Sequence, residues 1–135
     1  MVKISALKAA KVYAKTGGLC WYCGKNLKMS EGNNDLSEYC VEHQTPLIQG
    51  GANTLENLVP ACRRCNSRKG FKNVEQFREY ISINHYRDKH GHDWFTDSQL
   101  EYLEETFNIR IPRPEPHVFH GEKSKGGDIS GQVTA

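Results

Sequence analysis

Apolar residues at helical spacing define the first predicted element, a short helix near the N-terminus. Four of them recur three or four positions apart over residues 4–15: Ile4, Leu7, Ala10 and Ala14. Residues with this spacing lie on one face of an α-helix. The Gly17-Gly18 pair follows at the place where a helix usually ends in a glycine cap. The pattern therefore predicts one amphipathic helix before the first cysteine.

A second group of elements is predicted in the middle of the chain. Residues 39–43 (YCVEH) are short and sufficiently β-branched or aromatic for a strand, after a polar surface loop at residues 29–38. Residues 49–53 (QGGAN) have turn chemistry, so the chain should reverse there. The region after Cys62 is periodic enough for a helix through Asn66 to Lys69, which Gly70 would end.

The last part of the chain is predicted to be helical and then irregular. Apolar residues at helical spacing indicate a helix over residues 73–84: Val74, Phe77, Tyr80 and Ile81. Thr96 and Gln99 have the form of a capping box, and the helix that they begin should stop near Asn108. Prolines and a Gly/Ser/Lys-rich stretch predict an extended or disordered tail over residues 112–135. Three histidines that match no ligand pattern are expected in loops: His85, His90 and His92.

The length and composition fit one compact domain with short appendages. With 135 residues, of which 37% are hydrophobic, core burial alone would give marginal stability. The predicted organisation is an N-terminal helix (1–18), a core (19–72), a helical extension (73–111) and a tail (112–135). No stretch approaches the ~18 consecutive apolar residues that a membrane span needs, so no membrane association is predicted. No secretory signal is recognisable, which predicts a cytoplasmic protein with reduced thiols.

Four of the five cysteines form two C-x2-C pairs, Cys20 with Cys23 and Cys62 with Cys65. Each pair has the build of a zinc knuckle, and two knuckles place four thiolates around one tetrahedral ion. A redox C-x-x-C motif is the alternative, but it needs a different fold context and no second pair. The sequence therefore predicts one structural Zn2+ site, with Cys40 as a small buried apolar residue.

Basic residues cluster around the second cysteine pair, although the net charge of +2 does not by itself indicate a nucleic-acid partner. The segment from Pro60 to Lys72 has no acidic residue and five basic ones: Arg63, Arg64, Arg68, Lys69 and Lys72. Taken alone, this block would be interpreted as a solvated helix face. Trp21 and Tyr22 in the first knuckle could stack on bases, but packing against the zinc site is the favoured interpretation.

The segment between the cysteine pairs carries several motifs in order. Residues 41–70 read VEHQTPLIQGGANTLENLVPACRRCNSRKG. They contain an acid before a histidine, a proline, a glycine pair, an Asn-Leu pair, and a C-x2-C-Asn stretch that ends in Lys-Gly. In these features the chain from Leu19 to Gly70 resembles the HNH endonuclease family. The resemblance implies an α+β fold, in which a two-stranded hairpin and a helix surround one metal ion (a ββα-metal unit), here with a four-cysteine zinc site and flanking helices.

The resemblance also implies roles for four residues. His43 would be the general base, Glu42 and Asn66 the ligands of a catalytic ion, and Asn57 the residue that holds the hairpin loop. The chemistry is consistent, since an imidazole takes a proton from water at neutral pH and a divalent ion stabilises charge on the leaving oxygen. Oxygen ligands favour Mg2+ or Mn2+. Adjacent strand residues point to opposite faces, so Glu42 and His43 share a site only if the strand bends or ends there, which Pro46 makes plausible.

Three functions follow from these residues. The favoured one is a DNA endonuclease, in which four basic residues become phosphate contacts that do not read bases: Arg63, Arg64, Arg68 and Lys69. The second is a zinc module that binds nucleic acid without cutting it, but such a module does not need Glu42, His43 and Asn66 together. The third is a nuclease on RNA or structured junctions. The sequence leaves open whether the chain is a monomer or a homodimer, and whether cleavage is sequence-specific.

Overall fold

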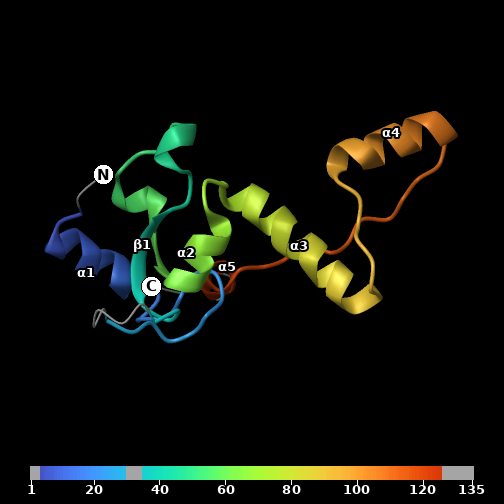
Figure 1. Cartoon of the computed structure of the whole chain (residues 1–135). Coiled ribbons are helices and arrows are strands. Elements are labelled where there is room, and N and C mark those ends of the chain that lie inside the picture. Colours follow the sequence, from blue (N-terminus) through green and yellow to red (C-terminus); the bar gives the residue numbers. More distant parts are fainter. Residues whose placement is uncertain (1–3, 30–34, 126–135) are drawn as a thin grey trace. The chain divides into compact units, whose positions relative to one another are not determined.

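The computed structural model of the chain describes residues 4–29 and 35–125 (Figure 1). These residues form two compact units. The first unit contains the described residues up to Val74 together with those from Val118 onward. The second unit is Glu75–His117. The predicted loop at residues 29–38 lies partly outside the described residues, because 30–34 are among those not described.

The first unit is built on an antiparallel hairpin of β1 (Tyr39–His43) and β2 (Leu58–Cys62). The pairing runs from Tyr39 opposite Cys62 to His43 opposite Leu58, so both strands have their full length in register. Every residue of β2 is buried, and Pro60 is tolerated because each strand of a two-stranded sheet has a free edge. The predicted strand at residues 39–43 is confirmed.

The helix α2 (Arg63–Lys69) follows β2 without a loop and completes a ββα arrangement. Cys62 is its N-cap, with Sγ accepting a hydrogen bond from the backbone N–H of Cys65 at 3.4 Å. Gly70 ends the helix with a positive φ of 55°, a conformation that favours glycine. The predicted α+β class and the helix end at Gly70 are both confirmed.

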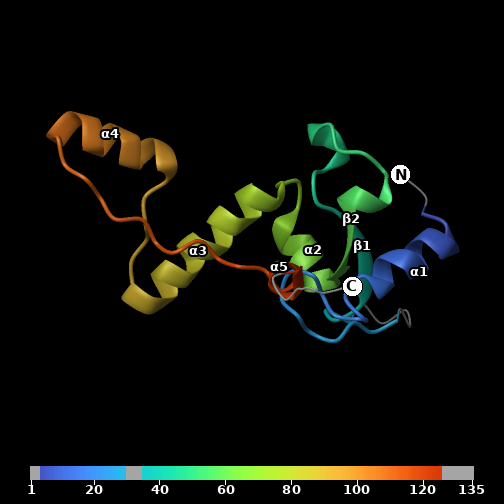
Figure 2. The ribbon, with the colours of Figure 1, turned by 180° about the vertical axis from the view of Figure 1, so that it is seen from behind.

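The helix α1 (Ala6–Ala14) packs on the hairpin (Figure 2). Ser5 caps it, accepting a hydrogen bond from the backbone N–H of Lys8 at 3.1 Å. The phenol of Tyr39 donates to the carbonyl of Ala9 at 2.6 Å, and Lys15 donates from Nζ to the carbonyl of Leu58 at 2.6 Å. These contacts attach α1 to both strands, so the predicted N-terminal helix is confirmed and has a definite partner.

The connection between the strands contains two short 3-10 turns, η1 (Leu47–Gln49) and η2 (Leu55–Asn57). Gly50 has a φ of 88° and makes the predicted chain reversal. A β-carbon on Gly51 would lie 1.8 Å from the carbonyl oxygen of Thr45. Only glycine therefore allows the chain at residue 51 to pass this close to Thr45.

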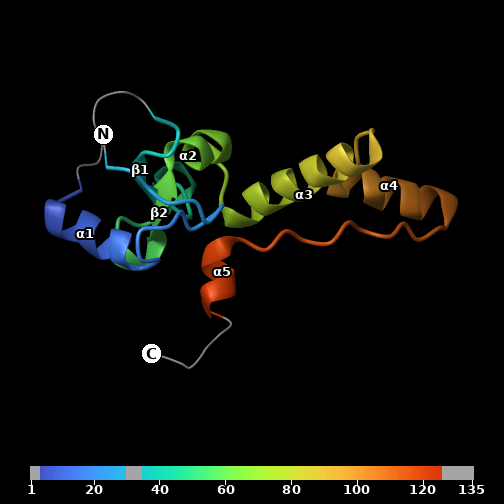
Figure 3. The ribbon, with the colours of Figure 1, turned by 90° about the horizontal axis from the view of Figure 1, so that it is seen from below.

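A second segment of the first unit comes from the far end of the chain. Phe119 is buried, and its ring lies 5.0 Å from that of Tyr22 and 5.8 Å from that of Trp21. The helix α5 (His120–Lys125) follows, and the backbone N–H of Gly121 donates to the carbonyl of Trp21 at 2.7 Å (Figure 3). The prediction of an extended or disordered tail is therefore wrong for His120–Lys125, which form α5, whereas residues 112–119 have no helix or strand and residues 126–135 lie outside the described part.

The second unit contains α3 (Val74–His90), most of which belongs to it, and α4 (Asp97–Phe107). Both halves of the predicted capping box at Thr96 are present, and Asn108 ends α4 in the left-handed conformation. Acidic side chains outnumber basic ones in residues 75–117. One of the acidic groups, Glu104, accepts two hydrogen bonds from Arg113, at 2.8 and 3.0 Å.

The helix predicted to end at residue 84 continues to His90, so the expectation that His85 and His90 lie in loops is wrong. The additional turns carry no apolar periodicity. Side-chain contacts along the helix are present instead, including the rings of Tyr86 and His90 at 4.2 Å. Gly91, with a φ of 78°, ends the helix, and His92 follows it in a bend. Among the described residues, no helix is both long and apolar enough to cross a membrane.

Candidate active site and metal centre

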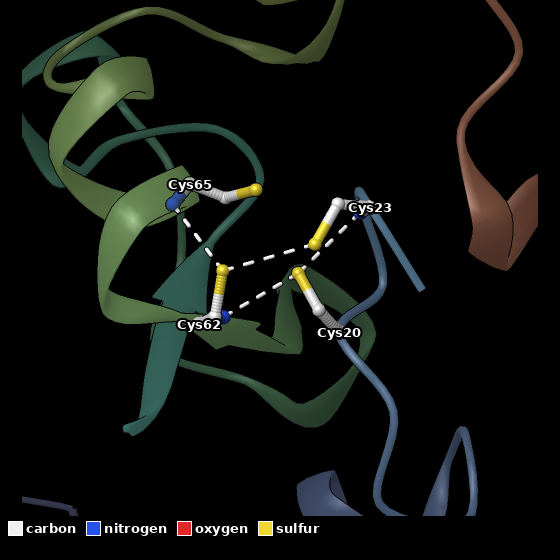
Figure 4. Close-up of side chains that lie close together, drawn as sticks. All are labelled: Cys20, Cys23, Cys62 and Cys65. Carbon is white, nitrogen blue, oxygen red and sulfur yellow. Dashed lines mark hydrogen bonds between the residues drawn. The ribbon is translucent and has the colours of Figure 1, made fainter. Parts of the chain in front are cut away.

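The four paired cysteines converge on one point of the first unit (Figure 4). Cys20 and Cys23 come from the first knuckle, whereas Cys62 is the last residue of β2 and Cys65 lies in the first turn of α2. Their sulfur atoms all lie within 4.8 Å of one another and face a common centre. Three of the cysteines are buried and Cys23 is exposed. The hairpin and the knuckle are thus joined where the strand passes into the helix.

The dimensions of this cluster fit a zinc ion. The Sγ atoms of Cys23 and Cys62 are 3.8 Å apart, and four sulfurs about 2.3 Å from a tetrahedral zinc are separated by about 3.8 Å. The backbone N–H groups of Cys23 and Cys62 lie 3.5 and 3.4 Å from Sγ of Cys20. Hydrogen bonding from the Cys23 side chain lowers the pKa of the Cys20 thiol, whereas hydrogen bonding with Cys20 raises the pKa of the Cys23 and Cys65 thiols. The donor set is therefore that of a structural zinc site.

Glu42 lies in a buried network. Its side chain is 5% exposed, and it accepts hydrogen bonds from the phenol of Tyr22 and from Nζ of Lys69, the latter at 2.8 Å. Burial raises the pKa of the Glu42 carboxyl, and the hydrogen bonds from Lys69 and Tyr22 act in the opposite direction. Burial also raises the pKa of Tyr22, which keeps its phenol protonated as the donor. Glu42, the expected metal ligand, therefore already accepts hydrogen bonds from the first knuckle and from α2.

Lys69 is not available as the phosphate contact that its place in the basic block predicted. Its side chain is fully buried and forms an ion pair with Glu42. The same Nζ donates to the backbone carbonyl of His43 at 2.9 Å. Charge patterning along a short helix predicts only that a lysine in its last turn is exposed. A buried acid on the neighbouring strand binds it instead, as buried charges require a partner.

His43 ends β1 with a half-buried side chain. Its Nε2 lies 3.1 Å from the amide oxygen Oδ1 of Asn53, a residue that we expected only as part of a turn. Asn57 accepts a hydrogen bond from the backbone N–H of Thr45 at 2.9 Å and donates to the carbonyls of Thr45 and Ala52 at 2.9 and 2.8 Å. These bonds join the start and the end of the connection between β1 and β2, directly after His43.

Asn66 is exposed on α2, one helical turn before Lys69. Residues three positions apart on a helix are neighbours, so Asn66 lies next to the residue that contacts both Glu42 and the His43 carbonyl. Three arginines on the same helix remain on the surface to different degrees. Arg64 and Arg68 are exposed, whereas Arg63 is half-buried and pairs with Glu38 at 3.4 Å.

The aromatic residues of the first knuckle are part of the core. Trp21 and Tyr22 are both buried, and their rings meet edge to face at 5.1 Å. This agrees with the favoured interpretation of packing and excludes base stacking in this conformation. Their main aromatic partner, Phe119, is about a hundred residues away in the sequence, so no local pattern could identify it.

Comparison with known proteins finds similarity in the segment that holds the cysteine cluster and His43. The model of the HNH endonuclease family matches residues 20–72, which include both cysteine pairs, the hairpin and α2. Over 87 residues the chain is 34% identical to the type IV methyl-directed restriction enzyme EcoKMcrA of Escherichia coli strain K12, covering 62% of this chain. The matched part covers 28% of that enzyme, so the chain spans less than a third of its relative's length. Residues 20–72 of this chain therefore match the HNH endonuclease family.

Proposed function

We propose that this chain is a metal-dependent endonuclease that hydrolyses phosphodiester bonds in DNA, with His43 as the general base. The observation that carries the proposal is the half-buried imidazole of His43 at the end of β1, within a segment that matches the model of the HNH endonuclease family. A base at the end of β1 is partly accessible to water, and its backbone belongs to a strand and not to a loop. Strand and helix positions hold reacting groups more accurately than loops do.

The proposed role of His43 is to take a proton from the attacking water. The backbone on its C-terminal side is held by two hydrogen bonds: its carbonyl accepts from Lys69 at 2.9 Å, and the next N–H, of Gln44, donates to the carbonyl of Asn57 at 2.8 Å. A fixed backbone limits the positions of the imidazole to the rotation of two side-chain bonds. Such restriction favours proton transfer, because the base does not have to be oriented during the reaction.

Asn66 and Glu42 are the proposed ligands of a Mg2+ or Mn2+ ion, which when bound would stabilise the charge that develops on the leaving oxygen. Asn66 fits this role, since its side chain is exposed and offers an amide oxygen. Glu42 fits it only after a rearrangement, because the ammonium of Lys69 lies 2.8 Å from Oε2 and competes with any cation there. Metal binding through Glu42 therefore requires that Lys69 move from this oxygen.

We propose that DNA is bound through the first unit. Arg64 and Arg68 are exposed on the helix that carries Asn66, and Arg63 contributes if its ion pair with Glu38 opens. These side chains would contact phosphates and give binding that weakens as salt increases. The acidic balance of residues 75–117 argues against phosphate contacts by the second unit. The methyl-directed restriction activity named for the E. coli relative is compatible with a DNA substrate.

The buried Glu42–Lys69 pair favours a second candidate, a zinc module that binds nucleic acid without cleaving it. One experiment separates the two. Plasmid DNA, single-stranded DNA and RNA are incubated with the purified chain in Mg2+, in Mn2+ and in excess EDTA, and the products are resolved on gels. We expect divalent-dependent cutting of plasmid that is lost in His43→Ala, while zinc content and circular dichroism are unchanged. Equal cutting by His43→Ala would exclude the proposed base, and binding without cutting in either metal would favour the zinc module.

A further inference from the structure

We propose that Asn53 is a positioning residue for His43, which fixes the orientation of the imidazole and the nitrogen that carries its proton. The amide oxygen Oδ1 of Asn53 lies 3.1 Å from Nε2 of His43. An amide oxygen is only an acceptor, so Nε2 must be the protonated nitrogen. In a neutral imidazole the other nitrogen, Nδ1, then has the free electron pair. This inference rests on the proposed role of His43 and assigns Nδ1 as the atom that accepts the proton of water.

Asn53 is itself held in place from both sides. The carbonyl of Ala52, in the peptide group before Asn53, accepts a hydrogen bond from Nδ2 of Asn57 at 2.8 Å. The carbonyl of Asn53, in the peptide group after it, accepts from Nζ of Lys8 on α1 at 3.0 Å. Because both flanking peptide groups are restrained, the side-chain amide of Asn53 projects from a fixed backbone.

The contact therefore joins two restrained segments of the first unit. His43 lies on the hairpin, with its carbonyl bound to Lys69 of α2. Asn53 lies in the connection between the strands, bound to α1 through Lys8. Both segments are held by backbone contacts, so the 3.1 Å bond restricts the orientation of the His43 ring. A fixed ring is what a general base needs to meet a water at one position.

The test compares Asn53→Ala with Asn53→Asp, using Asn26→Ala as the control. Alanine removes the acceptor, whereas aspartate keeps one. Asn26 is an exposed asparagine of the same unit. Each full-length, zinc-loaded protein is labelled with 15N-histidine, and the six histidines are distinguished by comparison with His43→Ala. The imidazole N–H signal of His43 is then recorded. Single-turnover cleavage of plasmid in Mg2+ is measured alongside, together with plasmid binding.

We expect a proton on Nε2 of His43 that is protected from exchange with water in the wild type, Asn53→Asp and Asn26→Ala. In Asn53→Ala this proton should exchange fast enough for its signal to disappear. Cleavage by Asn53→Ala should be slower by about 10- to 100-fold with unchanged binding of plasmid, as expected for a base out of position. A proton on Nδ1 in the wild type would overturn the inference. So would an unchanged Nε2 proton and cleavage rate in Asn53→Ala.

The two readouts separate this inference from the proposed function. The spectrum does not depend on cleavage, so a protected Nε2 proton that Asn53→Ala removes supports the contact even if His43→Ala cuts DNA normally. In that outcome only the role of His43 as base would fail. If His43→Ala abolishes cutting while Asn53→Ala changes neither spectrum nor rate, His43 remains the base and the role of Asn53 is rejected.

Discussion

Replacing Lys69 with methionine is expected to destabilise the first unit by about 3 kcal/mol, the lower end of the range for removing one partner of a buried ion pair. Lys69 is fully buried and Glu42 is 5% exposed, so water cannot replace the lost ammonium. The hydrogen bonds to Glu42 and to the His43 carbonyl are both lost. Methionine fills most of the space of the lysine stem, which limits the packing loss. Because burial already raises the pKa of Glu42, protonation of the carboxyl limits the cost of the unpaired charge.

Urea unfolding of the full chain with excess zinc measures this cost. In a Trp94→Phe background, Trp21 is the only tryptophan and its fluorescence reports on the first unit. With a slope of about 1–3 kcal/mol per molar urea, a loss of 3 kcal/mol lowers the midpoint by about 1–3 M. Lys72→Met is the matched control, since Lys72 is half-exposed and its replacement should cost under about 0.5 kcal/mol. Equal midpoints for the two variants would refute the argument.

A double-mutant cycle identifies the partner. Glu42→Gln removes the other charge and leaves Lys69 unpaired, so it should also be destabilising. The double variant has no unpaired charge, and its cost should be smaller than the sum of the single costs by about 1–3 kcal/mol. Strict additivity would mean that the two side chains act independently, contrary to their 2.8 Å contact.

Three further predictions concern the zinc site, α5 and the second unit. Cys62→Ser should lose bound zinc, whereas Cys40→Ser should retain one zinc per chain because Cys40 lies outside the cluster. Zinc is measured after gel filtration, and equal zinc contents in the two variants would contradict the site. Gly121→Ala places a β-carbon 1.9 Å from Nε1 of Trp21, so it should lower the free energy of unfolding by about 1–3 kcal/mol. The displaced indole should also be quenched more strongly by acrylamide. Hydrogen bonds from an arginine hold the pKa of Glu104 at about 2 instead of 4.5; the stabilisation is present above pH 4.5 and is lost as pH falls toward 2. The melting temperature of the second unit should fall over that pH range, and less so in Glu104→Gln.

Local patterns in the sequence were sufficient to predict most of the helices and strands. The strand at Tyr39–His43, the glycine that ends α2 and the capping box at Thr96 depend on neighbours within a few residues, and all are present. The two cysteine pairs also form one cluster, as their spacing predicted. Each of these features arises from short-range chemistry that the sequence displays directly.

The features that the sequence did not reveal depend on contacts between distant residues. Lys69 is buried because an acid 27 residues earlier lies opposite it, and charge patterning along one helix cannot identify such a partner. Phe119 covers Trp21 and Tyr22 although it follows a proline-rich stretch typical of disorder. Asn53 lies in a stretch with the composition of a turn, and its contact with His43 forms only when the connection between the strands folds back toward the end of β1. Tertiary structure decides all three.

Because Phe119 and Gly121 return the chain to the knuckle aromatics, the first unit is made from two separate stretches of sequence. The second unit is therefore an insertion in the sequence of the first unit, to which it is connected at both ends. A fragment that stops at Val74 would lack the ring that covers Trp21 and Tyr22. The smallest fragment that keeps the first unit whole is discontinuous, so residues near 74 and 118 would have to be joined by a linker when the second unit is exchanged or left out.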